Sequence, residues 1–108
     1  MPQLSVYKNK NPKTRSSYPY LVDVQSDLLS DIGTRVVVPL LKRTASTKKP
    51  VKNLMPVVKV DGQEFIMMVP LLAGIASGEL GTPVASVSQH RSEVVAALDF
   101  LITGIQPR

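Results

Sequence analysis

Apolar and polar residues alternate along two short stretches near the start of the chain, residues 4–8 and residues 20–24. Such alternation places apolar side chains on one face of an extended segment and is typical of half-buried β-strands. A third apolar stretch, residues 35–41, predicts another strand. The residues between the first two stretches, 9–19, are polar, basic and interrupted by Pro12, so we expect an exposed hairpin loop there.

The clearest local signal is Asp61-Gly62, which lies within a β-rich run that spans residues 56–68. Both residues readily adopt positive φ, as the central positions of a type I′ turn require, so the pattern predicts a β-hairpin. Before it, residues 42–53 are low in hydrophobicity and predict a mobile loop. After it, residues 71–84 are spaced by glycines and predict one or two short, irregular strands.

The last part of the chain repeats apolar residues at the spacing of an α-helix. Offsets of four, seven and eleven define one apolar face that suits contact with a core: Val94, Leu98, Leu101 and Ile105. Ser86 and Gln89 have the spacing of a capping box ahead of this helix, and Gly104 provides its stop.

The order of these elements predicts a mainly antiparallel β fold with one α-helix at the C-terminus. At 108 residues the chain has the size of one domain, which can bury about two-thirds of the surface of its unfolded chain. The sequence shows no internal repeat, so we expect residues 1–108 to fold as a single domain.

Composition limits the chemistry that this chain can perform. It has no cysteine, so disulfide bonds and thiolate metal sites are excluded, and the reducing cytoplasm is the expected compartment. The longest apolar run, residues 36–41, contains Pro39 and is too short to span a membrane. The carboxylates show no spacing that gathers three around a metal ion, and no glycine-rich loop suits a phosphate, so we expect no cofactor.

The single histidine, His90, lies three residues before Glu93 in the predicted helix. Such a pair can transfer protons in catalysis, but two groups on one helical turn are usually a surface pair. Because we find no other candidate catalytic set, we expect a protein that is not an enzyme and that acts by binding.

The formal charge of +5 is concentrated in the first half of the chain, where residues 1–53 carry ten Lys and Arg against three Asp. The cations form two clusters, one with Lys8, Lys10, Lys13 and Arg15, and the other with Lys42, Arg43, Lys48, Lys49 and Lys52. Such clusters can bind nucleic acid or an acidic protein segment, but a pair of solvated loops explains them equally well.

Two groups of apolar residues have no evident place in a core. Leu28 and Leu29 are adjacent within a polar turn, whereas Ile102 lies off the apolar face of the helix, beside Asp99 and Thr103. Unexplained apolar surface marks interaction sites, so together they predict one apolar surface for a partner. Alternatively the turn folds back and buries both leucines, and Ile102 packs against a neighbouring loop or a second subunit.

Four segments, YPYLVDVQSDLL, RVVVPL, LMPVVKVDGQEFIMM and the closing AALDFLITGI, occur in this order between Leu4 and Ile105. With them the chain resembles the CcdB toxins of bacterial toxin–antitoxin modules. The resemblance implies a homodimer of SH3-like barrels of antiparallel strands, each with a small inserted sheet and a C-terminal α-helix. It also implies binding to the A subunit of DNA gyrase and trapping of the gyrase–DNA cleavage complex, without catalysis by the toxin itself.

The resemblance further implies a CcdA-type antitoxin whose acidic, disordered tail displaces the toxin from gyrase. Alternating toxin and antitoxin dimers repress the operon, so the toxin meets operator DNA only through the antitoxin. The matching antitoxin site is the basic segment with Lys8, Lys10, Lys13 and Arg15. Residues 67–76 would lie near the dimer interface, although interior packing explains Met67 and Met68 equally well.

By the same resemblance, the gyrase site comprises the dileucine turn and the end of the helix: Leu28, Leu29, Asp99, Ile102, Thr103, Gly104 and Ile105. The best-known family member has Asn in place of Asp99 and Trp in place of Thr103. Loss of an aromatic anchor removes a contact that commonly contributes about 2 kcal/mol or more, which predicts weaker or altered gyrase binding. Two alternatives stay open: an mRNA endoribonuclease of the same fold, and a non-toxic relative that binds only the antitoxin.

Overall fold

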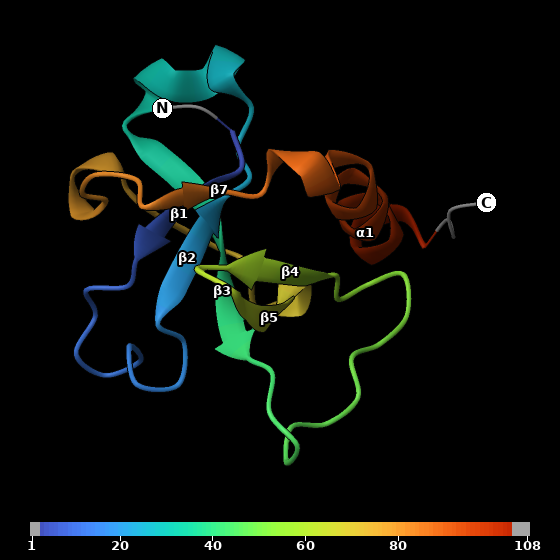
Figure 1. The fold of residues 1–108 in the computed structure, drawn as a ribbon. Helices are drawn as coiled ribbons and strands as arrows, with labels where there is room; N and C mark the ends of the chain where they lie inside the picture. The colour runs from blue at the N-terminus through green and yellow to red at the C-terminus, as the bar shows by residue number, and fades with distance from the viewer. Residues whose placement is uncertain (1–2, 105–108) are drawn as a thin grey trace.

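The computed structural model describes residues 3–104 as a curled antiparallel sheet with an α-helix beside it (Figure 1). The strands are β1 (Ser5–Lys8), β2 (Tyr20–Asp23), β3 (Thr34–Lys42), β4 (Val57–Val60), β5 (Gln63–Met67), β6 (Ala73–Ala76) and β7 (Ala85–Ser86). The helices are the 3₁₀-helices η1 (Asp27–Ile32), η2 (Val69–Leu71), η3 (Ser77–Glu79) and η4 (Ser88–His90), and the α-helix α1 (Arg91–Thr103). Within these residues the predicted mainly β fold, a nearly closed antiparallel barrel with one C-terminal helix, is confirmed.

Strand β3 is the centre of the sheet because its two edges pair with three other strands. One edge pairs with β2, in a register that places Tyr20 opposite Leu40. The other edge pairs with β6 through the first half of β3 and with β5 through its last three residues. The order of the sheet is β4-β5-β3-β2-β1-β7, with β6 also on β3. The inserted β4–β5 hairpin therefore continues the same hydrogen-bonded sheet from the end of β3.

The hairpin turn between β4 and β5 has the conformation that the sequence predicts. Asp61 has φ of 53° and Gly62 has φ of 78°, and Val60 pairs with Gln63 on either side of them. Two successive residues at positive φ are the mark of a type I′ turn, whose twist matches that of the flanking strands. The Asp-Gly pair thus fixes this hairpin locally.

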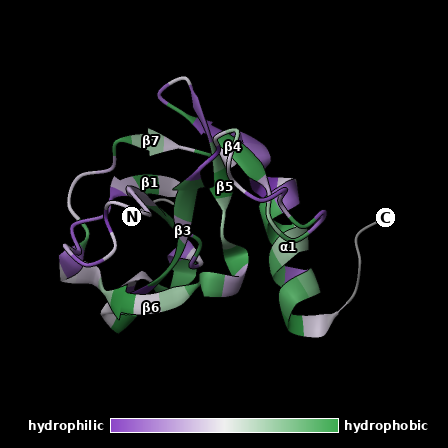
Figure 2. Cartoon of the chain, turned by 90° about the horizontal axis from the view of Figure 1, so that it is seen from below, coloured by the Kyte–Doolittle hydropathy of each residue, from purple (hydrophilic) through white to green (hydrophobic). Residues whose placement is uncertain are grey.

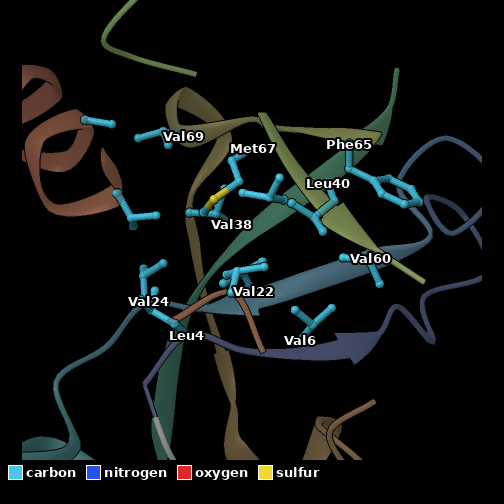
Figure 3. Close-up of a cluster of buried hydrophobic side chains, with 14 residues drawn as sticks. Leu4, Val6, Val22, Val24, Val38, Leu40, Val60, Phe65, Met67 and Val69 are labelled. Carbon is cyan, nitrogen blue, oxygen red and sulfur yellow. The ribbon is translucent and has the colours of Figure 1, made fainter. Parts of the chain in front are cut away.

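Alternate side chains of the strands point into the main core, whereas Tyr7, Val37 and Leu80 form a second, smaller cluster. Figure 2 shows hydrophobic colour along β3, β5 and much of α1, and hydrophilic colour mainly in the loops. In Figure 3 the side chains of Val22, Val38 and Leu40 meet Met67 of β5, and all four are fully buried. Met67 is therefore a core residue of the monomer, so interior packing is the explanation that holds for it.

Helix α1 covers this core with the face predicted for it. Val94 and Ala97 are buried, and Leu98 and Leu101 pack against the core cluster. Ile105, the fourth residue of the predicted face, lies outside the described residues. The apolar period of the last segment thus identifies the packed side of the helix.

The start of α1 differs from the prediction of a capping box. The hydroxyl of Ser86 accepts a hydrogen bond from the N–H of Ser88 at 3.2 Å, and a 3₁₀ turn, η4, follows before α1 begins at Arg91. A capping box at Ser86 and Gln89 is therefore wrong, because the Ser86 side chain closes a local turn instead. The predicted stop is confirmed: Gly104 has φ of 74°, and its N–H donates to the carbonyl of Phe100 at 2.9 Å.

Candidate partner-binding site

Large apolar side chains are exposed on η1. Leu28 is 95% exposed, Leu29 49% and Ile32 59%. The alternative in which this turn folds back and buries both leucines is wrong. Ile32 belongs to the same exposed group, although the sequence analysis did not identify it. We call these three residues the η1 patch.

The segment that carries the η1 patch consists of two short 3₁₀ turns that meet at a kink. The hydroxyl of Ser26 accepts a hydrogen bond from the N–H of Leu28 at 3.2 Å, and Gly33 ends the helix at φ of 80°. The helix is kinked at Leu29, where φ is −106°. Short 3₁₀-helices have poor internal hydrogen-bond geometry, so this one needs support from the rest of the protein.

A buried ion pair beneath η1 provides part of that support. Arg35 of β3 and Asp23 of β2 have fully buried side chains, and Nη2 of Arg35 lies 2.7 Å from Oδ2 of Asp23. The guanidinium also donates to the hydroxyl of Ser30 at 3.2 Å and to the carbonyl of Gln25 at 3.3 Å. Because a buried charge is tolerated only when it is paired and hydrogen-bonded, these contacts fix η1 to the sheet.

Gln25 completes the connection between the sheet and η1. Its side-chain Nε2 donates to the carbonyl of Leu29 at 2.8 Å, and its Oε1 accepts from the N–H of Val36 at 3.1 Å. Its own N–H donates to Oδ1 of Asp23 at 3.1 Å. We call Asp23, Gln25 and Arg35 the polar hub. The hub positions the η1 patch, and the signal for it was that Asp23 and Arg35 are charged residues directly beside apolar runs.

Tyr7 lies next to this hub and is almost fully buried. Burial raises the pKa of its phenol above the ordinary value of 10.0, and the negative charge of Asp23 raises it further. The phenol is therefore neutral at physiological pH and leaves the charge balance of the Asp23–Arg35 pair unchanged.

The end of α1 presents an exposed apolar residue apart from the η1 patch. Ile102 is 74% exposed, so within one chain it does not pack against a neighbouring loop. Asp99 and Thr103 are exposed beside it, and the hydroxyl of Thr103 donates to the carbonyl of Asp99 at 2.6 Å. Gly104 then ends the helix in the left-handed conformation. Val95, 44% exposed, is seven residues before Ile102 and shares its side of the helix.

The sequence analysis expected the two apolar features to form one surface. Within the chain they lie apart. Figure 1 shows η1 at the upper edge of the molecule, above β1 and β2, and the end of α1 on the right. The arrangement follows from topology, because η1 connects β2 to β3 whereas α1 leaves the sheet from β7. A single chain therefore offers two separate apolar contacts.

The predicted basic loop between β1 and β2 is exposed but well organised. Asn9, which is buried, donates to the carbonyl of Tyr18 at 2.8 Å and to the hydroxyl of Thr14 at 3.0 Å. Its Oδ1 accepts from the N–H of Asn11 at 3.0 Å. The loop presents its cations from this frame, and all four are exposed: Lys8, Lys10, Lys13 and Arg15.

The predicted pair at the start of α1 is present at the surface. Nδ1 of His90 lies 3.1 Å from Oε1 of Glu93, and the Glu93 side chain is 60% exposed. No group of three metal-binding side chains occurs within residues 3–104. In the same part of the chain, no helix combines the length and the apolar character that crossing a membrane requires.

Comparison with protein families gives one match that covers almost the whole chain. A family model described as CcdB protein matches residues 3–104. The matched range includes the η1 patch, the polar hub, the basic loop and all of α1. It therefore covers every described feature of the candidate site.

Proposed function

Because this chain belongs to the CcdB family, a family of toxins from toxin–antitoxin modules, we propose that it binds the A subunit of DNA gyrase and traps the gyrase–DNA cleavage complex. The observation that carries the proposal is the exposure of Leu28, at 95%, on a helix that a buried ion pair holds in place. An apolar side chain so exposed and so firmly positioned is typical of a contact residue. The toxin acts by holding the enzyme, and its antitoxin neutralises it.

Two contact regions on each chain support this proposal. The first is the η1 patch, of which Leu28 and Leu29 match the family's gyrase-facing pair. The second is the end of α1, with Asp99, Ile102, Thr103 and Gly104, all exposed. Ile105 is part of the same proposed region and lies outside the described residues. Because Thr103 stands where the best-known member has Trp, Ile102 is the main apolar contact of this second region.

We further propose that the toxin is a homodimer. Leu71 of η2 is 46% exposed and Val95 of α1 is 44% exposed, and η2 packs against α1. A second copy would cover these exposed side chains and bring the proposed contact regions of two chains into one assembly. Light scattering on the purified protein tests it, with twice the mass of the chain as the expected result and the mass of one chain as the contradicting one.

The gyrase proposal is tested with purified protein, gyrase and supercoiled plasmid. We expect inhibition of supercoiling and accumulation of cleaved DNA after detergent and protease treatment. The variant Leu28→Ser/Leu29→Ser should lose this effect. Val51→Ser/Val84→Ser is the matched control, because these valines are 49% and 48% exposed on other loops. Retention of cleavage by the leucine variant, or equal loss in both variants, would contradict the proposed site.

An mRNA endoribonuclease is the second candidate, favoured by the net charge of +5 and by the contact between His90 and Glu93. Incubation with a structured RNA in parallel with the gyrase assay distinguishes the two. Cleaved DNA with intact RNA supports gyrase poisoning, and cleaved RNA that His90→Ala abolishes supports the endoribonuclease. If neither substrate is cleaved, the chain is a relative that retains antitoxin binding alone.

A further inference from the structure

Ile32 is a large apolar residue that takes no part in the packing of either core cluster. Its side chain is 59% exposed, and it belongs neither to the main cluster nor to the smaller one. Single exposed apolar residues are common on protein surfaces, but Ile32 follows Leu28 and Leu29 in the same short segment. A contact with another molecule explains why an isoleucine is exposed here, whereas the packing of the chain does not.

The backbone on both sides of Ile32 is held in place. The carbonyl of Gly33 accepts a hydrogen bond from the N–H of Ser77 at 3.0 Å, and Thr34 pairs with Ala76 of β6. The polar hub holds the other side of η1. The side chain of a β-branched residue also has few rotamers. Because little freedom remains to be lost, covering Ile32 with a partner costs little conformational entropy.

The three side chains of the η1 patch are close enough for one partner surface to contact them all. Leu28 and Ile32 are the outermost of them and are four residues apart. A 3₁₀-helix rises about 2.0 Å per residue, which places their Cα atoms about 8 Å apart. Ile32 therefore enlarges the contact that Leu28 and Leu29 offer.

Carboxylates flank the apolar side chains of the η1 patch. Asp27 is 57% exposed and lies 3.8 Å from the buried guanidinium of Arg35. Asp31 is exposed and forms no ion pair within residues 3–104. Residues 24–34 contain no lysine or arginine. The rim of the η1 patch is therefore acidic.

The second proposed contact region repeats this combination. Asp99 precedes Ile102 by three residues, which places both on one side of α1, and both are exposed. Residues 92–104 contain no lysine or arginine, whereas the whole chain has a formal charge of +5. Exposed aliphatic side chains beside carboxylates thus occur at two separate places on a basic protein.

We propose that Ile32 is a further contact residue for gyrase, and that the gyrase surface on the η1 patch is apolar at its centre and carries lysine or arginine side chains around it. The inference rests on the proposed function and names the chemistry of the partner surface. Carboxylates at the rim of an apolar contact attract cations and repel nucleic acid and acidic segments. The η1 patch and the basic loop therefore select partners of opposite charge.

Surface plasmon resonance with the gyrase A subunit tests the contact. Ile32→Ser should weaken binding about fivefold to thirtyfold, as expected when the exposed part of an isoleucine is no longer taken out of water. Ile32→Leu keeps the apolar area and should bind within about threefold of the parent protein. Val84→Ser, at a valine that is 48% exposed on another loop, is the control and should bind within about twofold. All three variants should keep the melting temperature of the parent protein, because these side chains are exposed.

The same measurement at low and high salt tests the charge of the partner surface. Asp31→Asn should weaken binding about twofold to fivefold at low salt, and the difference should disappear at high salt. Asp61→Asn is the matched control, because it removes the same charge from an exposed turn in which asparagine also fits. The control should bind as the parent protein does in both salts.

Four results with a parent protein that binds gyrase would overturn this inference while leaving the gyrase function standing. They are unchanged affinity of Ile32→Ser, equal weakening by Val84→Ser, tighter binding by Asp31→Asn, and equal weakening by Asp31→Asn and Asp61→Asn. A lower mass of Ile32→Ser than of the parent protein in light scattering would also overturn it, because the patch would then join two copies of the chain. Absence of gyrase binding by the parent protein would overturn the proposed function and this inference together.

Discussion

Arg35 and Asp23 carry opposite charges in a region from which water is excluded. Their contribution to the stability of the folded protein depends on complete hydrogen bonding of both side chains. Arg35 contacts the Asp23 carboxylate, the Ser30 hydroxyl and the Gln25 carbonyl. Removing one partner leaves the other charge buried and unpaired, whereas removing both leaves no charge to stabilise. The pair should therefore behave non-additively on mutation.

We predict that Asp23→Leu and Arg35→Met each lower the free energy of unfolding by about 3–5 kcal/mol. The double variant should lose less than the more damaging single change, because two apolar side chains replace two charges. Urea unfolding at neutral pH measures all three. The double variant should bind gyrase more weakly than the parent protein, because η1 has lost its contact with Arg35. Additive losses of stability would contradict this account of the pair.

Tyr7 makes the stability of the protein sensitive to alkaline pH. The pKa of its phenol is raised in the folded state by burial and by Asp23, so folding favours the neutral form. This stabilisation is complete below pH 10.0, the ordinary value, and is lost as the pH rises through the folded pKa. The phenol of an unfolded chain titrates between roughly pH 9 and pH 11. Over this range Tyr7→Phe should therefore lose less stability than the parent protein. Equal losses in urea unfolding at both pH values would contradict the prediction.

Single-residue burial was predictable where local pattern decides it and not where distant contacts do. The exposure of Ile102 followed from its position off the apolar face of α1, and the structure confirms it. The exposure of Leu28 and Leu29 stayed open, because it depends on Arg35, which follows Leu29 by six residues and belongs to β3, outside η1. Sequence spacing contains no information about that contact.

Among the elements, the β4–β5 hairpin and η1 show the same contrast. Asp61-Gly62 specifies its turn through the backbone conformations of two adjacent residues, so the hairpin was predictable. The residues of η1 were predicted only as a turn, because a short 3₁₀-helix has no apolar period and depends on the polar hub. The capping box failed for a related reason, since the Ser86 hydroxyl has two possible backbone partners and takes the nearer one.

The last turn of α1 gives a prediction about the strength of gyrase binding. Thr103 is exposed, and its hydroxyl is hydrogen-bonded to its own helix at Asp99, so it offers a partner only a small apolar contact. Thr103→Trp should strengthen gyrase binding by about tenfold or more, the usual contribution of an aromatic anchor. Surface plasmon resonance with the gyrase A subunit measures it, and Ser92→Trp, at an exposed position in the first turn of α1, is the control. Equal affinity of Thr103→Trp and the parent protein would show that this turn does not face gyrase.

On the scale of the whole molecule, the sheet separates two kinds of surface. The η1 patch lies beyond the Asp23 end of β2, and the two basic loops, residues 9–19 and 43–56, begin at its Tyr20 end. Charge counting along the sequence located the cations in the first half of the chain, but only strand register shows that both clusters leave the sheet at one end. The expectation of one continuous apolar surface failed at this scale, because η1 and α1 leave the sheet from different strands.

This separation predicts that the two surfaces act independently. The variants Leu28→Ser/Leu29→Ser and Lys48→Ser/Lys49→Ser change residues that lie beyond opposite ends of β2. Mutations at such distances add within about 0.5 kcal/mol, so the leucine changes should leave the affinity for a fluorescent polyglutamate peptide, a stand-in for the acidic antitoxin segment, within about twofold of the parent protein. The combined variant should show the peptide affinity of the lysine variant and the gyrase affinity of the leucine variant. Both affinities are measured on the parent protein and on the leucine, lysine and combined variants. A loss of peptide binding caused by the leucine changes would contradict the prediction, because it would require coupling through the polar hub and β2.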